Sequence, residues 1–241
     1  MSRISVIIPA YNEESSIGLV LDALPKKKIH EIIVVDNNSS DNTAFVAKEH
    51  GARVVKESRK GYGSACLKGM DELDSPDIVV FLDGDFSDYP EEIVSLLEPI
   101  EKGEIDFVLG SRMIISESRM ALLPQARFGN QLAVFLIKLF FNHAYTDLGP
   151  FRAIRYNSLI EIGMQDTNFG WTVEMQYKAA LLGLRSVDLD VSYRPRRAGV
   201  SKISGSIVGS ARAGLRIIAT IFQLWWRTRG RLRDHGSRDD G

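Results

Sequence analysis

Two aspartates, Asp83 and Asp85, stand two residues apart directly after the apolar run at 79–82. Carboxylates at this spacing can share a hard divalent cation, because Mg²⁺ and Mn²⁺ prefer oxygen ligands and often bind one or two carboxylates together with substrate phosphates. Gly84 between them would let a ligand approach the backbone. A solvated turn is the alternative, since Asp and Gly are frequent in turns. The apolar run before the pair favours the metal site.

Two further polar segments could contact a nucleotide. Asp36 also follows an apolar run. Its carboxylate could accept a hydrogen bond from a nucleobase N–H, or it could form an Asx turn or cap a helix. Residues 60–63 (KGYG) could bring the Lys60 ammonium and backbone amides near phosphate, or could form a turn that begins a helix. The residues alone leave these alternatives open.

Strand-like and helix-like patterns alternate through the first half of the chain. Short apolar runs, typical of buried parallel strands, predict strands at 4–8, 32–35, 53–56, 78–82 and 107–109. Segments of helical spacing predict helices at 17–24, 43–50, 61–73 and 90–102. This alternation predicts an α/β fold with an open, mostly parallel sheet flanked by helices. Ligands bind such sheets beyond the carboxyl ends of the strands, where the polar segments 11–13, 36–41 and 83–85 all fall.

The second half has a different character. Helices are expected at 126–141 and 172–182, a strand near 187–193, and a basic loop at 194–197. Residues 206–233 mix apolar residues with arginines and contain no acidic residue. Trp225 and Trp226 among arginines suit an amphipathic helix lying in a membrane interface. Packing on the core or on a second subunit is the alternative.

The order and spacing of three motifs resemble the opening of family 2 glycosyltransferases: residues 6–13 (VIIPAYNE), 33–43 (IVVDNNSSDNT) and 83–85 (DGD). The resemblance continues through 110–112 (GSR), 147–153 (DLGPFRA) and 196–202 (RRAGVSK). This longer pattern, over roughly residues 4–205, is similar to dolichyl-phosphate mannose synthases and bacterial polyprenyl-phosphate glycosyltransferases. It implies the GT-A fold, whose α/β domain binds a nucleotide sugar.

The resemblance also implies roles for individual residues. Donor-binding positions match Pro9, Tyr11, Glu13 and Asp36. Asp83 matches a carboxylate near ribose and metal, and Asp85 matches the main metal ligand, with Mg²⁺ or Mn²⁺ as cofactor. Positions that face the acceptor phosphate, or close over the donor and acceptor phosphates, match Arg112, Arg127, Arg196, Ser201 and Lys202. Lys60 would add positive charge near the donor diphosphate.

One position departs from this pattern, and one further residue has two possible roles. The mannose synthases carry Gln two residues after the second Asp, whereas this chain has Ser87 followed by Asp88, so water or Asp88 is left to complete the metal shell. An alcohol acceptor would need a carboxylate base, for which Glu174 is the best candidate. A helix residue paired to a nearby cation is the other interpretation of Glu174. A phosphate acceptor needs no base, because its dianion is already nucleophilic near pH 7.

The expected activity is metal-dependent, inverting transfer of a hexose from a nucleotide sugar, of GDP-mannose or UDP-glucose type, to a polyprenyl phosphate. The alternatives are a soluble family 2 enzyme with a hydroxyl acceptor and a non-catalytic nucleotide-sugar binder. We expect a glycosyltransferase domain at 1–205, with a nucleotide-sugar half at 1–115 and an acceptor half at 116–205. A basic amphipathic segment at 206–241 would follow.

Composition limits the partners and the compartment. The formal net charge is −1, which does not indicate a nucleic-acid partner. With one cysteine, Cys66, no internal disulfide can form, and a reducing cytoplasm fits. No run reaches about 18 uncharged apolar residues, so a spanning helix is not expected. The prediction is a cytoplasmic protein, peripheral on the cytoplasmic membrane face, with homo-oligomer formation left open.

Overall fold

The computed structural model describes residues 2–141, 143–196 and 214–226 of the 241-residue chain. Within these residues the strands are β1 (Ile4–Ala10), β2 (Glu31–Asp36), β3 (Arg53–Lys56), β4 (Ile78–Phe81), β5 (Phe107–Ser111), β6 (Arg152–Arg155) and β7 (Ser186–Asp190). The helices are α1 (Ile17–Ala23), α2 (Thr43–Glu49), α3 (Tyr62–Asp71), α4 (Ile93–Glu101), α5 (Ser116–Ala121), α6 (Pro124–Phe141), α7 (Tyr156–Ile162) and α8 (Trp171–Leu181). A 3-10 turn, η1 (Pro90–Glu92), precedes α4, and residues 214–226 are helical.

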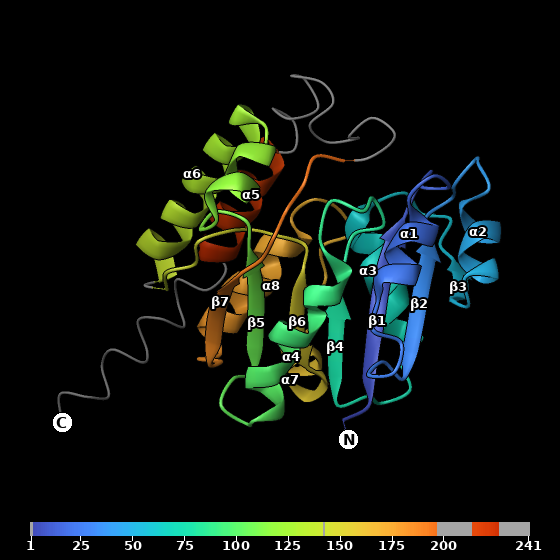
Figure 1. Cartoon of the computed structure of the whole chain (residues 1–241). Helices are drawn as coiled ribbons and strands as arrows, with labels where there is room; N and C mark the ends of the chain where they lie inside the picture. Colours follow the sequence, from blue (N-terminus) through green and yellow to red (C-terminus); the bar gives the residue numbers. More distant parts are fainter. Residues whose placement is uncertain (1, 142, 197–213, 227–241) are drawn as a thin grey trace.

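The strands form one sheet in the order β3-β2-β1-β4-β6-β5-β7, and neighbouring strands are parallel except where β6 is involved. All strands of the sheet other than β6 therefore end at the same edge, which we call the carboxyl edge. It is the upper edge in Figure 1. Because β6 runs the opposite way, the loop that leads into β6 also lies at the carboxyl edge.

Helices cover both faces of the sheet and form two apolar cores. Alternate residues of β1 enter the two cores, as expected for a strand buried on both sides. Val6 and Ile8 pack in the core that includes residues of α1, α2 and α4. Ile7 packs in the core that includes residues of α3, α6, α7 and α8. The result is the three-layer α/β architecture that the sequence pattern predicts.

The sequence pattern did not predict β6, α5 or α7. β6 has the sequence RAIR, in which an arginine at each end interrupts the short apolar pair, so no strand-like run is visible. Its place between β4 and β5 depends on contacts with strands far away in the chain. The strands β6 and β7, both from the second half of the chain, complete a sheet that begins in the first half.

The helix at 214–226 lies against α6 and α8, as Figure 1 shows. Ile221 is fully buried, and the Phe140 ring lies 5.1 Å from the Trp225 ring between centroids. Tyr177 donates a hydrogen bond of 3.3 Å from its hydroxyl to the Leu224 carbonyl. One face of this helix thus packs on the core, while Trp226 on another face is exposed. Among the residues that the structure describes, no helix is long and apolar enough to span a bilayer.

Candidate active site

Strained backbone marks three of the loops at the carboxyl edge. Asn12, Asn38 and Phe86, which follow β1, β2 and β4, have positive φ angles of 54°, 65° and 60°. Asparagine tolerates this left-handed region, whereas phenylalanine rarely adopts it. Such conformations cost about 1–3 kcal/mol each and persist only where the surroundings hold them, commonly at functional sites.

Three carboxylates crowd the loop after β4. The Oδ1 atom of Asp83 and both carboxylate oxygens of Asp88 are buried and have no hydrogen-bond partner among the described residues. Burial, together with the Asp85 carboxylate, raises the pKa of Asp83 to about 7. Burial and the Asp83 carboxylate raise the pKa of Asp88 well above its ordinary value. Because buried like charges are costly unless a cation neutralises them, the loop fits a divalent cation.

The metal candidates in this loop are the pair Asp83 and Asp85. Among the described residues, no group of three or more His, Cys, Asp or Glu side chains is arranged to hold one metal ion, so Asp88 does not make a three-carboxylate set with the pair. The expectation that Gly84 lets a ligand approach the backbone stays a prediction. A Cβ added there would stand 3.4 Å from Ile17 and 3.5 Å from Ile8, in ordinary contact with the core.

Arg196 joins two loops that the sequence separates widely. Its guanidinium donates 2.8 Å to Oδ2 of Asp85 and 3.1 Å to Oε1 of Glu13. The three side chains were expected to contact phosphate, metal and nucleoside respectively, and they meet at the carboxyl edge. Arg196 thereby supplies a positive charge beside the carboxylate expected to bind a metal.

The donor residues expected near β1 and β3 also converge. The Lys60 ammonium lies 5.2 Å from the centre of the Tyr11 ring. Asn37, which sequence reasoning missed, holds the Lys60 loop: its amide donates 2.8 Å to the Arg59 carbonyl, and its carbonyl accepts 2.9 Å from the Gly61 N–H. In the sequence, the position of Asn37 next to Asp36 was the only indication of a role for it.

One carboxylate oxygen of Asp36 forms the Asx turn that was one of the interpretations of this residue. Oδ1 of Asp36 accepts a 3.0 Å hydrogen bond from the Ser39 N–H. Pro9 pairs with Val35 near the ends of β1 and β2, so it lies at the same edge. The nucleoside-binding role of both residues stays a prediction.

The glycines at 61 and 63 serve packing rather than an open phosphate cradle. The Ser64 N–H donates 3.0 Å to the Thr167 carbonyl, so an amide at the start of α3 is already occupied. A Cβ at Gly63 would stand 2.1 Å from the Asp166 carbonyl oxygen. The turn-and-helix alternative for this segment is therefore the better interpretation of its amides.

Replacing Gly63 with alanine is expected to lower the free energy of unfolding by about 2 kcal/mol or more, because backbone must move to admit the methyl group. Gly129 in α6 is a matched control, since a Cβ there meets no described residue within 4 Å and alanine favours a helix. Urea denaturation of both variants checks the difference. Equal stability of the two variants would contradict this packing role.

Arg112 is held by a buried carboxylate. Its Nε and Nη2 atoms donate 2.7 Å and 2.9 Å to the two oxygens of Asp147, and its backbone N–H donates 2.9 Å to Oδ2. Burial alone would raise the pKa of Asp147, but Arg112 outweighs burial and holds that pKa below its ordinary value. The Arg112 guanidinium lies 5.1 Å from the centre of the Tyr193 ring. Asp147 is thus a positioning residue that fixes the orientation of Arg112.

A second buried arginine supports the loop that carries Asp147. Arg152 is fully buried, and it donates to the carbonyls of Gly149 and Thr172, the latter at 3.1 Å. Arg152 therefore holds the 147–150 loop, which leads into β6, against the start of α8. Sequence reasoning assigned no role to Arg152, because burial of an arginine cannot be read from its neighbours in the chain.

Of the remaining residues predicted to contact the acceptor, only Arg127 lies in the described part of the chain. Arg127 lines a shallow hollow of about 470 Å³ with Arg119, Pro124, Phe128 and Gln131. Arg112 is not among the described residues that line this hollow. Ser201 and Lys202 fall outside the described residues.

Glu174 has structural partners that favour the second interpretation of this residue. Its carboxylate accepts hydrogen bonds from the N–H groups of Gln165 and Asp166, at 2.7 Å for the latter. Lys178 pairs with it at 2.7 Å. These contacts hold the 163–170 loop against α8, and they leave Glu174 poorly suited to accept a proton from a substrate.

The family model that describes glycosyl transferase family 2 matches residues 5–163. The chain belongs to this family. An uncharacterized glycosyltransferase of Mycobacterium tuberculosis is 38% identical over 222 residues, covering 92% of this chain and 96% of that protein. An undecaprenyl-phosphate mannosyltransferase of Micrococcus luteus is 31% identical, covering 87% and 90% of the two chains. The predicted enzyme class is confirmed.

The fold of this family 2 glycosyltransferase also has solved counterparts. Glucosyl-3-phosphoglycerate synthase from Mycobacterium tuberculosis, solved with Mn²⁺, UDP-glucose and glycerol 3-phosphate, superposes with a TM-score of 0.73 at 24% identity, covering 92% of this chain and 80% of that chain. The predicted GT-A fold is confirmed.

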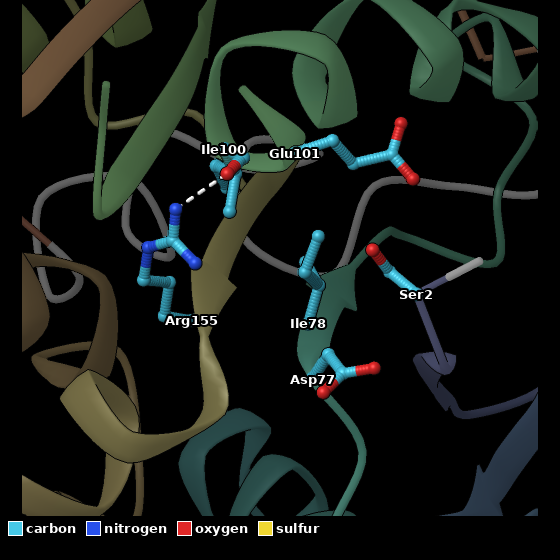
Figure 2. A pocket seen from close by; sticks show the side chains of 6 residues that line it. All are labelled: Ser2, Asp77, Ile78, Ile100, Glu101 and Arg155. Carbon is cyan, nitrogen blue, oxygen red and sulfur yellow. Dashed lines mark hydrogen bonds between the residues drawn. The ribbon is translucent and has the colours of Figure 1, made fainter. Parts of the chain in front are cut away.

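A second hollow of the glycosyltransferase, of about 330 Å³, lies away from the cluster described above. Figure 2 shows Arg155 in it, donating to the Ile100 carbonyl. Ile78, which also lines this hollow, begins β4, whereas Asp83 follows the end of β4. The hollow is therefore at the opposite edge of the sheet from the candidate active site.

Proposed function

We propose that this glycosyltransferase transfers a hexose from a nucleotide sugar to a polyprenyl phosphate, with Mg²⁺ or Mn²⁺ held by Asp83 and Asp85. The observation that carries the proposal is the placement of Arg112. The Arg112 guanidinium is fixed by Asp147 and interacts with carboxylates of the loop at 83–88, which we call the acidic loop. It is therefore suited to hold a phosphate next to the donor diphosphate. The name of the Micrococcus luteus relative, an undecaprenyl-phosphate mannosyltransferase, supports a lipid phosphate acceptor.

Each charged residue of the site would have a separate role in the reaction. Asp83 and Asp85 would hold the cation, which, when bound, neutralises charge that develops on the departing diphosphate. Lys60 and Arg196 would contact the donor phosphates. Arg112 would orient the acceptor phosphate, whose oxygen attacks the anomeric carbon as the bond to the nucleoside diphosphate breaks, with inversion. Because the acceptor is already an anion, this route needs no protein base.

Transfer to a hydroxyl acceptor is a second candidate, and Asp88 favours it. Asp88 is buried, and its charge interacts with that of Arg112. In the part of the chain that the structure describes, its carboxylate oxygens have no hydrogen-bond partner. It could accept a proton from an alcohol, the role first considered for Glu174. An Asp88→Asn variant would then lose transfer, whereas transfer to a phosphate would tolerate it better.

The deciding experiment supplies radiolabelled nucleotide sugars with Mg²⁺ or Mn²⁺ to a short polyprenyl phosphate and, in parallel, to the matching polyprenol. Label in the phosphate lipid alone supports the proposal and names the donor. Label in the polyprenol, lost in Asp88→Asn, supports the second candidate. Donor binding without transfer to any acceptor would support a non-catalytic nucleotide-sugar module instead.

Exposed apolar side chains near α6 suit a protein that is peripheral on the cytoplasmic face of a membrane. Phe128, Phe135 and Leu139 of α6 are exposed, as are Leu215 and Trp226 of the adjoining helix. Arg119 and Arg127 line the same hollow as Phe128, whereas Arg216, next to Leu215 in the chain, lies 3.9 Å from Asp166. The sequence continues with further arginines at 227–233. Apolar residues beside cations suit an anionic lipid surface.

Replacing Leu215, Phe222 and Trp226 together with serine is expected to release the protein from vesicles of phosphatidylglycerol and phosphatidylcholine, as measured by flotation. Truncation is a poorer test, because Ile221 on the same helix is part of the core. Phe45→Ser is the matched control, since Phe45 is 65% exposed in α2, on the far side of the sheet from α6 (Figure 1). Unchanged flotation of the triple variant would refute the proposal that these side chains bind a membrane.

Stability should depend on pH through Asp83. Because its pKa of about 7 lies above the ordinary value of 3.8, the metal-free protein gains stability from this proton at low pH and loses it as pH rises through 7. Mg²⁺ needs the deprotonated carboxylate, so the stability that it adds should be larger at pH 8 than at pH 5.5. Urea denaturation with and without Mg²⁺ at both pH values checks this expectation. In an Asp83→Asn variant, the stability that Mg²⁺ adds should be the same at both pH values.

A further inference from the structure

Arg194 holds the loop that follows Asp85 at three successive carbonyls. Its Nε atom donates 2.7 Å to the Phe86 carbonyl, and its Nη2 atom donates 3.2 Å to the Asp88 carbonyl. Its backbone N–H donates 2.9 Å to the carbonyl of Ser87 between them. One residue therefore satisfies the loop's backbone acceptors from residue 86 to residue 88.

The same guanidinium contacts two aromatic rings of the loop and of the turn that follows. The Arg194 carbon Cζ lies 3.6 Å from the centre of the Phe86 ring and 4.1 Å from the centre of the Tyr89 ring. Planar guanidinium groups stack well on aromatic faces, and lysine cannot reproduce both the stacking and the forked hydrogen bonds. Arg194 thus holds Phe86, whose φ of 60° needs such support, by its carbonyl and by its ring.

The loop conformation sets the orientation of the Asp85 carboxylate. The N–H of Ser87 donates 2.9 Å to Oδ1 of Asp85, and the Arg194 backbone holds the carbonyl of the same serine. Two residues after Arg194, Arg196 donates to Oδ2 of Asp85. Both oxygens of this carboxylate are therefore oriented by groups whose positions depend on the segment 193–196.

We propose that Arg194 is a positioning residue that presents the Asp85 carboxylate to a divalent cation and joins the acidic loop to the basic segment that carries Arg196. The inference rests on the metal-dependent function proposed above. Residues that orient a metal ligand without touching the metal typically change affinity by about 10- to 100-fold when they are replaced. Arg194 acts on the ligand through backbone carbonyls and ring contacts.

The test measures Mn²⁺ binding to the folded protein by electron paramagnetic resonance, with a nucleoside diphosphate present and without any acceptor or turnover. Arg194→Gln and Arg194→Lys are each expected to weaken Mn²⁺ binding by about 10-fold or more. Arg185→Gln is the matched control. Arg185 also ties distant segments, since it bonds Asp106 and, at 3.0 Å, the Gly103 carbonyl, but it does so at the opposite edge of the sheet. Its loss should leave Mn²⁺ affinity unchanged.

The outcomes separate this inference from the proposed function. If the wild-type protein binds Mn²⁺, Asp85→Asn does not, and the folded Arg194 variants bind as the wild type does, Arg194 has only a structural role and the inference is wrong. If the wild-type protein itself binds no Mn²⁺ with a nucleoside diphosphate present, the metal-dependent function fails first. Should Arg194→Gln not fold, Phe86→Leu tests the same contact from the other side and should also weaken binding.

Discussion

Replacing Asp85 with asparagine is expected to lower the rate of hexose transfer by about 1,000-fold while the protein stays folded. Metal stabilisation of a departing phosphate contributes several kcal/mol, and about 1.4 kcal/mol corresponds to tenfold in rate. Asparagine keeps an oxygen that can accept from the Ser87 N–H, so the loop should survive. Initial rates with saturating donor, together with circular dichroism, measure both parts of the prediction.

Asp77→Asn provides the control for Asp85. Asp77 precedes β4 and accepts a 2.7 Å hydrogen bond from the Arg3 N–H at the opposite edge of the sheet, whereas Asp85 follows β4. An Asp77→Asn variant should transfer at the wild-type rate. Wild-type turnover by folded Asp85→Asn protein would rule out Asp85 as the main metal ligand.

Replacing Arg112 with alanine is expected to destabilise the protein by about 3–5 kcal/mol, because it leaves the Asp147 carboxylate buried and uncompensated. Asp147 is fully buried, and both of its oxygens accept from Arg112. Adding Asp147→Asn to this variant should recover part of the loss, since the uncompensated charge is removed. Urea denaturation of the single and double variants gives the interaction energy.

Testing the catalytic role of Arg112 needs a more conservative substitution than alanine, because alanine is expected to destabilise the protein. Arg112→Lys keeps the positive charge beside Asp147 but loses the forked geometry. We expect it to raise the KM for the acceptor phosphate and to leave the KM for the nucleotide sugar nearly unchanged. An equal rise in both KM values would place Arg112 on the donor side of the site instead.

Local patterns predicted much of the fold and of the donor side of the site. Apolar runs such as 78–82 marked strands that are buried on both faces, and polar residues directly after them had to lie at one edge of a parallel sheet. Asp83, Asp85 and Glu13 were identified in this way and by motif spacing. The assignment of these residues to substrate and metal stays a prediction.

Residues that act through distant partners were not predictable in the same way. Arg194 looked like part of a basic loop, but the structure uses it to hold carbonyls more than 100 positions earlier in the chain. Glu174 looked like a candidate base until its partners at Gln165, Asp166 and Lys178 were visible. A charged residue reveals its role only through the groups it contacts.

The sequence by itself determined the α/β class, the direction of the first strands and the edge where polar residues gather, because those features follow from short-range periodicity and chain connectivity. The tertiary structure alone decided that β6 enters the sheet antiparallel, that Asp147 fixes Arg112, and that Arg196 reaches Asp85 and Glu13. These features depend on pairing between residues that are 35 to 183 positions apart in the chain. Burial favours such pairings because a buried charge without a partner is costly, and no local pattern encodes that choice.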